Sequence, residues 1–203
     1  MSTGSRPPSG YRPGVRFRRK RKDPADPAPV AAAAGDVPDG DTAQDQTAEQ
    51  VRRDLQRVID RFGWAVLHGG GNPGDPRYSS TVGLTALGHP EVIVVGLPFE
   101  AGEKYLNLVG EAVRAGARFA PGAATTALTD ASSPVVFLQV EGDPRTTVAE
   151  QFYGSIEVLQ LVWPDSTGKL PWEEGHRNPP SAQPLLGTPP VDPSEAADPP
   201  PAE

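Results

Sequence analysis

The chain has 203 residues, a formal net charge of −7 and no cysteine. This length allows one domain of ordinary size plus tails. The lack of cysteine excludes a disulfide framework, a disulfide-linked partner, a thiolate metal site and a cysteine nucleophile. No apolar run approaches the roughly 20 residues that span a bilayer, so we expect a cytoplasmic protein with no membrane contact.

The charges are distributed unevenly along the chain. Residues 1–22 contain eight Lys and Arg and no Asp or Glu, which leaves 11 basic against 26 acidic residues in the remainder. Because an acidic surface repels phosphate groups, nucleic acid is not expected as a ligand of this remainder. The basic run Arg16–Lys22 predicts either a weak polyanion contact or a solvated tail that folds back on the acidic body.

Ordered structure is expected to begin at Thr47. The preceding residues 23–46 are rich in Pro, Ala and Asp and offer too little apolar surface to order. Thr47 and Gln50 have the spacing of a capping box, and Gly63 suits the left-handed residue just past a helix end. An apolar stripe between them predicts a helix over 47–62, with inward-facing Val51, Leu55, Val58, Ile59 and Phe62.

Short β-rich segments and two further helices follow. The second main helix is predicted over 98–115, ends at Gly116, and turns inward Tyr105, Leu106, Leu108, Val109, Ala112 and Val113. Thr147 and Glu150 form a second capping box before a short helix that ends near Gly154. Residues rich in Val, Thr and aromatics predict strands at 64–68, 78–84, 91–97, 135–140 and 158–163, and 125–128 is left open as a short strand.

After the last predicted strand the chain returns to the body. Asp165 and Gly168 suit the first and last positions of a type I turn. Leu185 and Leu186 are predicted to pack back on the domain. Residues 188–203 consist mainly of Pro, Asp, Glu and Ala and are expected to be disordered.

These elements favour an α+β fold with a mainly antiparallel sheet, two main helices and one short helix. The strands come in consecutive groups rather than in alternation with helices, which favours this class over a parallel sheet. A half-open barrel is an alternative arrangement of the same strands. The predicted layout is a disordered basic arm and linker over 1–46, a single domain over 47–187 and a disordered tail over 188–203.

Three short motifs resemble catalytic or cofactor-binding sequences but lack the partners that those chemistries need. The run 68–71, HGGG, is similar to the oxyanion loop of lipases, yet no G-x-S-x-G serine elbow is present. Gly69, Gly71 and Gly74 fit G-x-G-x-x-G, but prolines interrupt the segment and a strand follows it. The run 163–165, WPD, is similar to the acid loop of tyrosine phosphatases, whose nucleophile is a cysteine thiolate.

The histidines do not indicate a metal site. His68, His89 and His176 are the three histidines of the chain. No two of them have the H-x-H or H-E-x-x-H spacing that brings ligands together on one element. We therefore expect no metal and no cofactor.

A cluster at the predicted strand ends is the best candidate for a small-ligand pocket. Aromatic walls with a few polar groups suit such a pocket, and the cluster comprises Tyr78, Thr81, His89, Glu91, Trp163, Asp165, Trp172 and Gln183. If they converge, Glu91 or Asp165 could perform acid–base chemistry with His89. The alternative is structural, with the tryptophans in the core and Asp165 capping its own turn.

Several segments of the body together carry a family resemblance. They are GWAVLHGG at 63–70, YSSTVGL at 78–84, GHPEVIVVGLP at 88–98, QFYG at 151–154, LQLVWPD at 159–165, G-x-x-PW at 168–172 and QPLLG at 183–187. With these segments the run 63–187 resembles a bacterial family known only as domain-of-unknown-function family 4262. The resemblance implies no established activity, cofactor or catalytic residue.

The favoured hypothesis is a soluble small-ligand-binding or protein-interaction domain without a catalytic nucleophile or metal of its own. The alternative is a flavin- or nucleotide-dependent enzyme of a half-open-barrel type. A TVGL strand followed by an apolar strand is loosely similar to the order of elements in flavin reductases. Such an enzyme needs cations for a phosphate, and Arg77 and Arg145 are the loop candidates. The acidic body counts against it.

Overall fold

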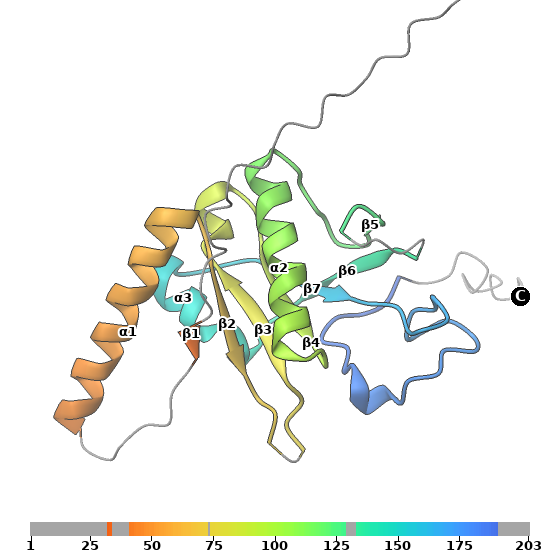
Figure 1. The fold of residues 1–203 in the computed structure, drawn as a ribbon, viewed down its shortest axis with the longest axis horizontal. Coiled ribbons are helices and arrows are strands. Elements are labelled where there is room, and N and C mark those ends of the chain that lie inside the picture. The colour runs from red at the N-terminus through yellow and green to blue at the C-terminus, as the bar shows by residue number, and fades with distance from the viewer. Residues whose placement is uncertain (1–31, 34–40, 73, 129–132, 191–203) are drawn as a thin grey trace, which may run out of the picture.

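The computed structural model describes residues 32–33, 41–72, 74–128 and 133–190 (Figure 1). Within them lie the helices α1 (Asp41–Phe62), α2 (Phe99–Arg114) and α3 (Thr147–Tyr153). The strands are β1 (Ala32–Ala33), β2 (Ala65–Gly69), β3 (Tyr78–Val82), β4 (Glu91–Val95), β5 (Ala124–Thr125), β6 (Val135–Val140) and β7 (Val158–Val162). None of the described helices is long and apolar enough to cross a membrane.

The strands form one open sheet with the order β1-β2-β3-β4-β7-β6-β5. Pairing is antiparallel except between β1 and β2 and between β4 and β7. The predicted α+β class and mainly antiparallel sheet are therefore confirmed, as are two main helices and one short helix. The half-open barrel is not formed, because β1 and β5 lie at opposite edges of the sheet in the part of the chain that the structure describes.

Alternate residues of each strand face opposite layers. One face packs on α2, where Leu106, Val109 and Val113 meet the ring of Phe137 and the indole of Trp64 in one buried core. The other face is covered by α1, α3 and the C-terminal segment, residues 183–190, through apolar side chains that include buried Leu55, Ile59 and Ala149 and partly buried Leu185 and Leu186. The domain is thus a sheet between two covering layers, with α2 lying along it in Figure 1.

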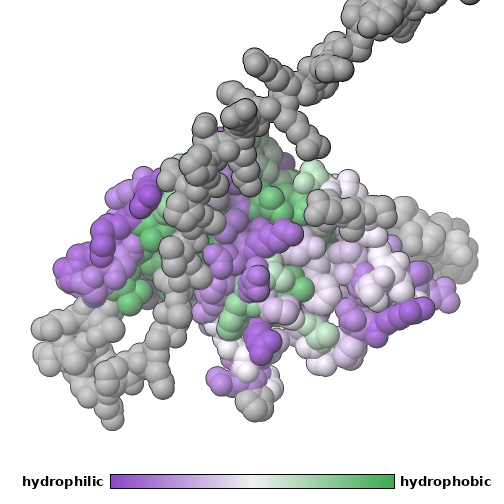
Figure 2. Space-filling view, viewed as in Figure 1, coloured by the Kyte–Doolittle hydropathy of each residue, from purple (hydrophilic) through white to green (hydrophobic). Residues whose placement is uncertain are grey.

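Helix α1 begins at Asp41, earlier than the predicted start at Thr47. The preceding residues include Ala and Gln, which are good helix formers, so nothing in the sequence stops the helix there. The side chain of Thr47 lies outside the described residues, but the helical backbone on both sides of it rules out a capping position. Val51 is 48% exposed, because the helix extends past the sheet at this end; Figure 2 shows most of its outer surface as hydrophilic.

The second predicted capping box is also wrong. Thr147 is the first helical residue of α3, and its hydroxyl donates to the carbonyl oxygen of Pro144 at 2.8 Å. The local cap is instead Asp143, whose carboxylate accepts from the backbone N–H of Arg145 at 2.9 Å. In α2 the expected inward set is right except for Leu108, which is 39% exposed.

Strands β3 and β4 each end two residues earlier than predicted, and a glycine causes each ending. Gly83 follows β3 with φ of 132°, and a Cβ there would lie 2.5 Å from the carbonyl oxygen of Gly63. Gly96 follows β4 with φ of 89°, where a Cβ would overlap the carbonyl oxygen of Ala182. Both glycines permit a close backbone approach that a side chain would block.

The predicted tails lie mostly outside the described residues. The basic run Arg16–Lys22 and most of the tail 188–203 belong to that part of the chain. Within the predicted linker the structure places β1 beside β2 and the first turns of α1. Leu185 and Leu186 pack on the sheet as predicted.

Candidate functional site

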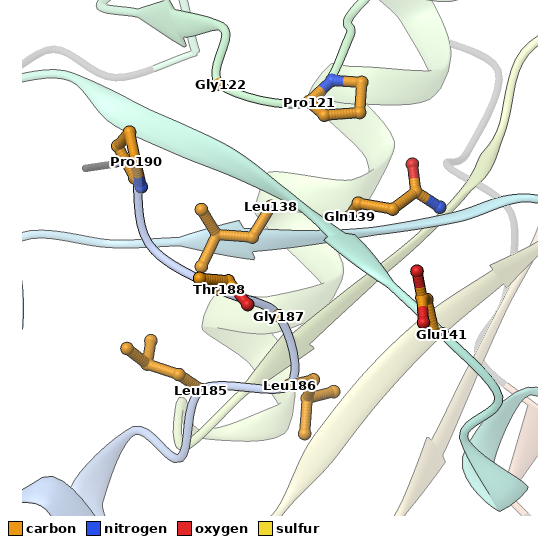
Figure 3. Close-up of a pocket in the computed structure, with 10 residues that line it drawn as sticks. All are labelled: Pro121, Gly122, Leu138, Gln139, Glu141, Leu185, Leu186, Gly187, Thr188 and Pro190. Carbon is orange, nitrogen blue, oxygen red and sulfur yellow. The ribbon is translucent and has the colours of Figure 1, made fainter.

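A groove of about 520 Å³ lies along the outer side of β6 (Figure 3). Strand β6 forms its floor and separates two walls, the loop before β5 and the C-terminal segment, which we define as residues 183–190. The residues that line the groove are Pro121, Gly122, Leu138, Gln139, Glu141, Leu185, Leu186, Gly187, Thr188 and Pro190. Most of them lie on loops or at the strand edge, so backbone groups form much of the surface.

The groove exists because β5 is too short to cover β6. Strand β5 pairs only with Val135 and Val136, and two further bonds join the N–H of Phe137 to Ala123 at 2.9 Å and its carbonyl to Gly122 at 2.7 Å. Since backbone groups alternate direction along a strand, Gln139 also turns its N–H and C=O away from β7. No strand lies beside Gln139 on that side in the described sheet, so this edge is unpaired.

Buried Gln160 of β7 holds the C-terminal segment on the sheet. Its amide oxygen accepts from the N–H of Leu186 at 2.7 Å, and its amide nitrogen donates to the carbonyl oxygen of Pro184 at 2.8 Å. Gly187 then passes the strand edge so closely that a Cβ would lie 2.1 Å from the carbonyl oxygen of Gln139. The wall of the groove is therefore fixed by hydrogen bonds and by a glycine.

The two sides of the groove differ in polarity. Leu138 lies on the sheet face that packs with Leu185, whereas Gln139 falls on the opposite face by strand alternation, and Glu141 follows directly after the end of β6. Figure 3 shows Leu138 between β6 and the C-terminal segment, with the side chain of Gln139 on the other side of the strand. Glu141 is exposed and is the one formally charged side chain among the described residues that line the groove.

The eight residues of the sequence-predicted cluster fall into separate groups. None of them lines the groove beside β6. Trp163 and Gln183 do meet, because the Gln183 amide accepts from the N–H of Trp163 at 2.9 Å and donates to its carbonyl oxygen at 2.8 Å. The Trp163 indole N–H donates to the carbonyl oxygen of Val95 at 3.0 Å. The side-chain amide of Gln183 thus makes the two hydrogen bonds to the backbone of Trp163, just past the end of β7, that a neighbouring strand would make.

Thr81 and Glu91 form a second group. The buried Glu91 carboxylate accepts from the hydroxyl of Thr81 at 2.6 Å and from the N–H of Gly83 at 2.9 Å. It also accepts from the N–H and the hydroxyl of Thr85, at 3.0 and 2.9 Å. Four donors occupy the two oxygens of this carboxylate, which fixes the turn after β3.

His89 bonds to backbone on both ring nitrogens. One nitrogen, Nδ1, lies 2.7 Å from the carbonyl oxygen of Pro90, and the other, Nε2, accepts from the N–H of Phe119 at 3.0 Å. These partners require a neutral imidazole with the proton on Nδ1. Burial lowers the pKa of His89, with the Arg118 guanidinium acting in the same direction. Both nitrogens are engaged, so this geometry leaves none for proton transfer.

Asp165 caps its own turn, as the structural alternative predicted. One carboxylate oxygen accepts from the hydroxyl of Thr167 at 2.6 Å and from the N–H of Lys169 at 3.1 Å, and the other accepts from the N–H of Arg177 at 2.7 Å. These bonds, that from Thr167 first, hold the pKa of Asp165 well below its usual range. The i to i+3 bond from Gly168 to Asp165, 3.0 Å, confirms the predicted turn.

The remaining two residues of the cluster pack in different places. Tyr78 packs against the buried cluster that contains Ile93 and Val95, with the Arg145 guanidinium 5.8 Å from its ring centroid. Trp172 packs against a separate cluster that contains Leu170. The eight residues therefore do not share one cavity in the described structure, and a common ligand role for them stays a prediction.

One arrangement that sequence reasoning missed has the composition of a serine hydrolase triad. His68 Nδ1 lies 2.8 Å from the Ser79 hydroxyl, and His68 Nε2 lies 3.8 Å from a Glu103 oxygen. Burial lowers the pKa of His68, and the nearby Glu103 carboxylate opposes this shift. Ser79 is only 2% exposed, and a Cβ on Gly102 would lie 2.7 Å from its hydroxyl oxygen. Helix α2 covers the hydroxyl, so a carbonyl substrate has no approach, and the triad serves to join α2 to the sheet.

The described residues offer little else that could hold a cofactor. They contain no group of three or more His, Asp or Glu placed to hold a metal ion. The loop cations proposed for a phosphate are engaged: Arg145 makes two bonds of 2.7 Å to Asp143, and the Arg77 guanidinium lies 5.7 Å from the Phe99 ring centroid.

The residues of the groove were missed because no catalytic motif marks them. One signal did exist, since the QPLLG segment at 183–187 supplies much of one wall and was predicted to pack on the body. What the sequence did not reveal is that β5 stops after two residues. Without that fact the outer side of β6 cannot be recognised as open.

Comparison with known proteins gives one family. The family model described as Domain of unknown function (DUF4262) matches residues 58–177. No curated protein and no solved structure matches the chain. The matched range covers β2 to β7 and ends before the C-terminal segment that walls the groove.

Proposed function

The chain belongs to the DUF4262 family, and we propose that it is a binding module that accepts an extended polypeptide segment in the groove beside β6. The observation that carries this proposal is the edge of β6 at Gln139 inside the groove, which no described strand pairs and whose carbonyl oxygen is approached by the backbone of Gly187. An extended peptide can add to such an edge through main-chain hydrogen bonds, while side-chain pockets supply specificity. Protein interaction is thereby preferred to the binding of a compact small molecule.

The walls of the groove favour a strand-like ligand. A peptide beside β6 would present alternate side chains to the two faces of the sheet. On one face it would meet Leu138 and Leu185, and on the other the polar side chain of Gln139, near Glu141 just past the end of the strand. The preferred ligand therefore alternates apolar and polar residues.

Catalysis has little support from the same geometry. The carboxylates of Glu91 and Asp165 and the ring of His89 are each committed to neighbouring donors or acceptors. A general acid or base needs a free position within hydrogen-bond reach of its substrate. We therefore assign these three residues to stability of the fold.

The test is a selection of random twelve-residue peptides displayed on phage against the full chain. The control is the variant Thr188→Trp, which fills the groove from an exposed lining position. We expect enriched peptides to bind the wild-type chain and to lose affinity for the variant. Methylation of alternate backbone nitrogens in a selected peptide should also remove binding, because added strands bind through the main chain.

Two results would overturn the proposal. In one, no peptide is enriched on the wild-type chain relative to Thr188→Trp. In the other, the enriched peptides tolerate every backbone methylation, which would show that main-chain pairing is not used.

A further inference from the structure

We propose that the groove beside β6 is occupied in the same molecule by the chain's own basic arm, residues 1–22. This inference rests on the proposed function and names the partner. Three independent features of the chain support it: the side-chain pattern of the arm, the charge around the groove and the length of the linker.

The side-chain pattern of the arm matches the two faces of the groove. In the arm Val15 and Phe17 alternate with Arg16 and Arg18, which is the period of a β-strand. Added beside β6, such a strand would place Val15 and Phe17 toward the leucines that line one face. Arg16 and Arg18 would then fall on the face of β6 that carries Gln139, near Glu141 just past the end of the strand.

The charges are complementary. The arm contains eight Lys and Arg and no acidic residue. Among the described residues that line the groove, Glu141 is acidic and none is basic. From Pro190, at the end of the groove, the sequence continues with four acidic residues and no basic one up to residue 203. Opposite charges at the two ends of the chain therefore favour an arm bound at this position.

The linker is long enough for binding within one molecule. A strand added on the outer side of β6 would lie six positions from β1 in the sheet, which corresponds to about 29 Å at roughly 4.8 Å per strand. Arg18 and Ala32 of β1 are fourteen positions apart, and an extended chain of that length spans at most about 46–50 Å. The arm can thus reach the groove from β1, with some length to spare for passing around the domain.

An arm bound in the groove would affect the binding of other ligands. While the arm occupies the groove, its arginines and lysines are held near acidic groups. A polyanion that binds the arm and a peptide that binds the groove would then each compete with the internal contact. The arm would act as an autoinhibitory segment of the binding module.

The test uses paramagnetic relaxation in the full chain. The chain has no cysteine, so Gly14→Cys gives a single site for a nitroxide label in the arm. We expect the label to broaden the amide signals of Leu138, Gln139 and Gly122 selectively. An unbound arm would instead broaden most strongly the strand next to β1, for example Leu67, because the arm is attached there.

Two variants and one matched control identify the contact. Glu141→Arg replaces an attraction with a repulsion, and it should lower the ratio of bound to unbound arm roughly threefold to tenfold. Thr188→Trp should abolish the broadening at Gln139 by filling the groove. Glu157→Arg reverses an exposed acidic residue that does not line the groove and should leave the broadening unchanged. Raising the salt from about 0.1 M to about 1 M should weaken the contact.

The outcomes separate this inference from the proposed function. Broadening centred on Leu67, or insensitive to both groove variants, would overturn the assignment of the arm. In a mixture, a chain that carries the nitroxide could broaden the signals of an isotope-labelled chain that carries none. That result would show that the arm binds a second copy, which overturns binding within one molecule. If the arm does not bind the groove while selected peptides still bind the wild-type chain and not Thr188→Trp, the proposed function is retained and only the inference about the arm is overturned.

Discussion

Replacement of Gln160 by methionine tests whether one buried amide fixes the C-terminal wall of the groove. Methionine has a similar length but offers no strong donor and no strong acceptor. Gln160→Met therefore removes the bond of 2.7 Å from the N–H of Leu186 and the bond of 2.8 Å to the carbonyl oxygen of Pro184. Gln160 is 0% exposed, so water cannot replace its amide at that position.

The expected loss follows from the two backbone groups left without partners. A buried group that loses its hydrogen bond costs about 1–3 kcal/mol, which gives about 2–6 kcal/mol for two. Leu186 and Pro184 are only partly buried, so water satisfies part of this loss, and we expect about 2–4 kcal/mol. For a domain of this size the midpoint temperature should fall by roughly 4–16 °C.

The measurement is urea unfolding followed by tryptophan fluorescence, with the same substitution at Gln139 as control. Gln139 lies on the neighbouring strand, and its amide nitrogen makes only bonds of 3.3 and 3.4 Å to carbonyl oxygens of Val158 and Val140. We expect Gln139→Met to cost less than about 1 kcal/mol. Gln160 does not fix the C-terminal wall if Gln160→Met is as stable as the wild-type chain, or if the two variants lose equal stability.

Three further predictions concern the core and two titrating groups. Gly110→Ala in α2 would place a Cβ 2.2 Å from Trp64; overpacking of about 1–3 kcal/mol should exceed the helix gain of about 1 kcal/mol, and thermal unfolding checks this. Because the pKa of Asp165 is depressed, its contribution to stability is present above the ordinary value of 3.8 and is lost as pH falls below it, so Asp165→Asn should flatten the acid limb of the stability profile. The pKa of His89 is lowered, so the unfolded chain takes up a proton first and stability should fall as pH drops below 6.5. An imidazole titration by NMR that gives His89 an ordinary or raised pKa would contradict this sign.

Local patterns in the sequence correctly predicted those elements that depend on residues close together in the chain. Strand β6 was predicted at its observed bounds, because VVFLQV is β-branched, apolar and bounded by turn residues. Gly63 and Gly116 end their helices with positive φ, as the need for a left-handed residue at a helix end requires. The Asp165 turn likewise depends on bonds within a few residues.

The predicted helix starts were wrong where a local sequence pattern permitted a cap but neighbouring residues could also begin or cap the helix. The capping-box spacing at Thr47 and at Thr147 was present, yet α1 starts earlier and Asp143 caps the turn before α3. Two residue types at a given spacing permit a cap, but neighbouring residues with comparable propensity compete for the same role. Exposure of Leu108 similarly reflects how far the core extends along α2.

The sequence by itself determined the class of this domain, the identity of most of its elements and the family to which they belong. Tertiary structure alone decided that β4 lies parallel to β7 and that β5 covers only the start of β6. It also decided that the C-terminal segment crosses the sheet face opposite to the one that packs on α2. These contacts join residues far apart in the chain, and periodicity within a segment carries no information about which segment lies beside it. The candidate groove depends on such contacts, because the edge of β6 is open only where β5 does not cover it.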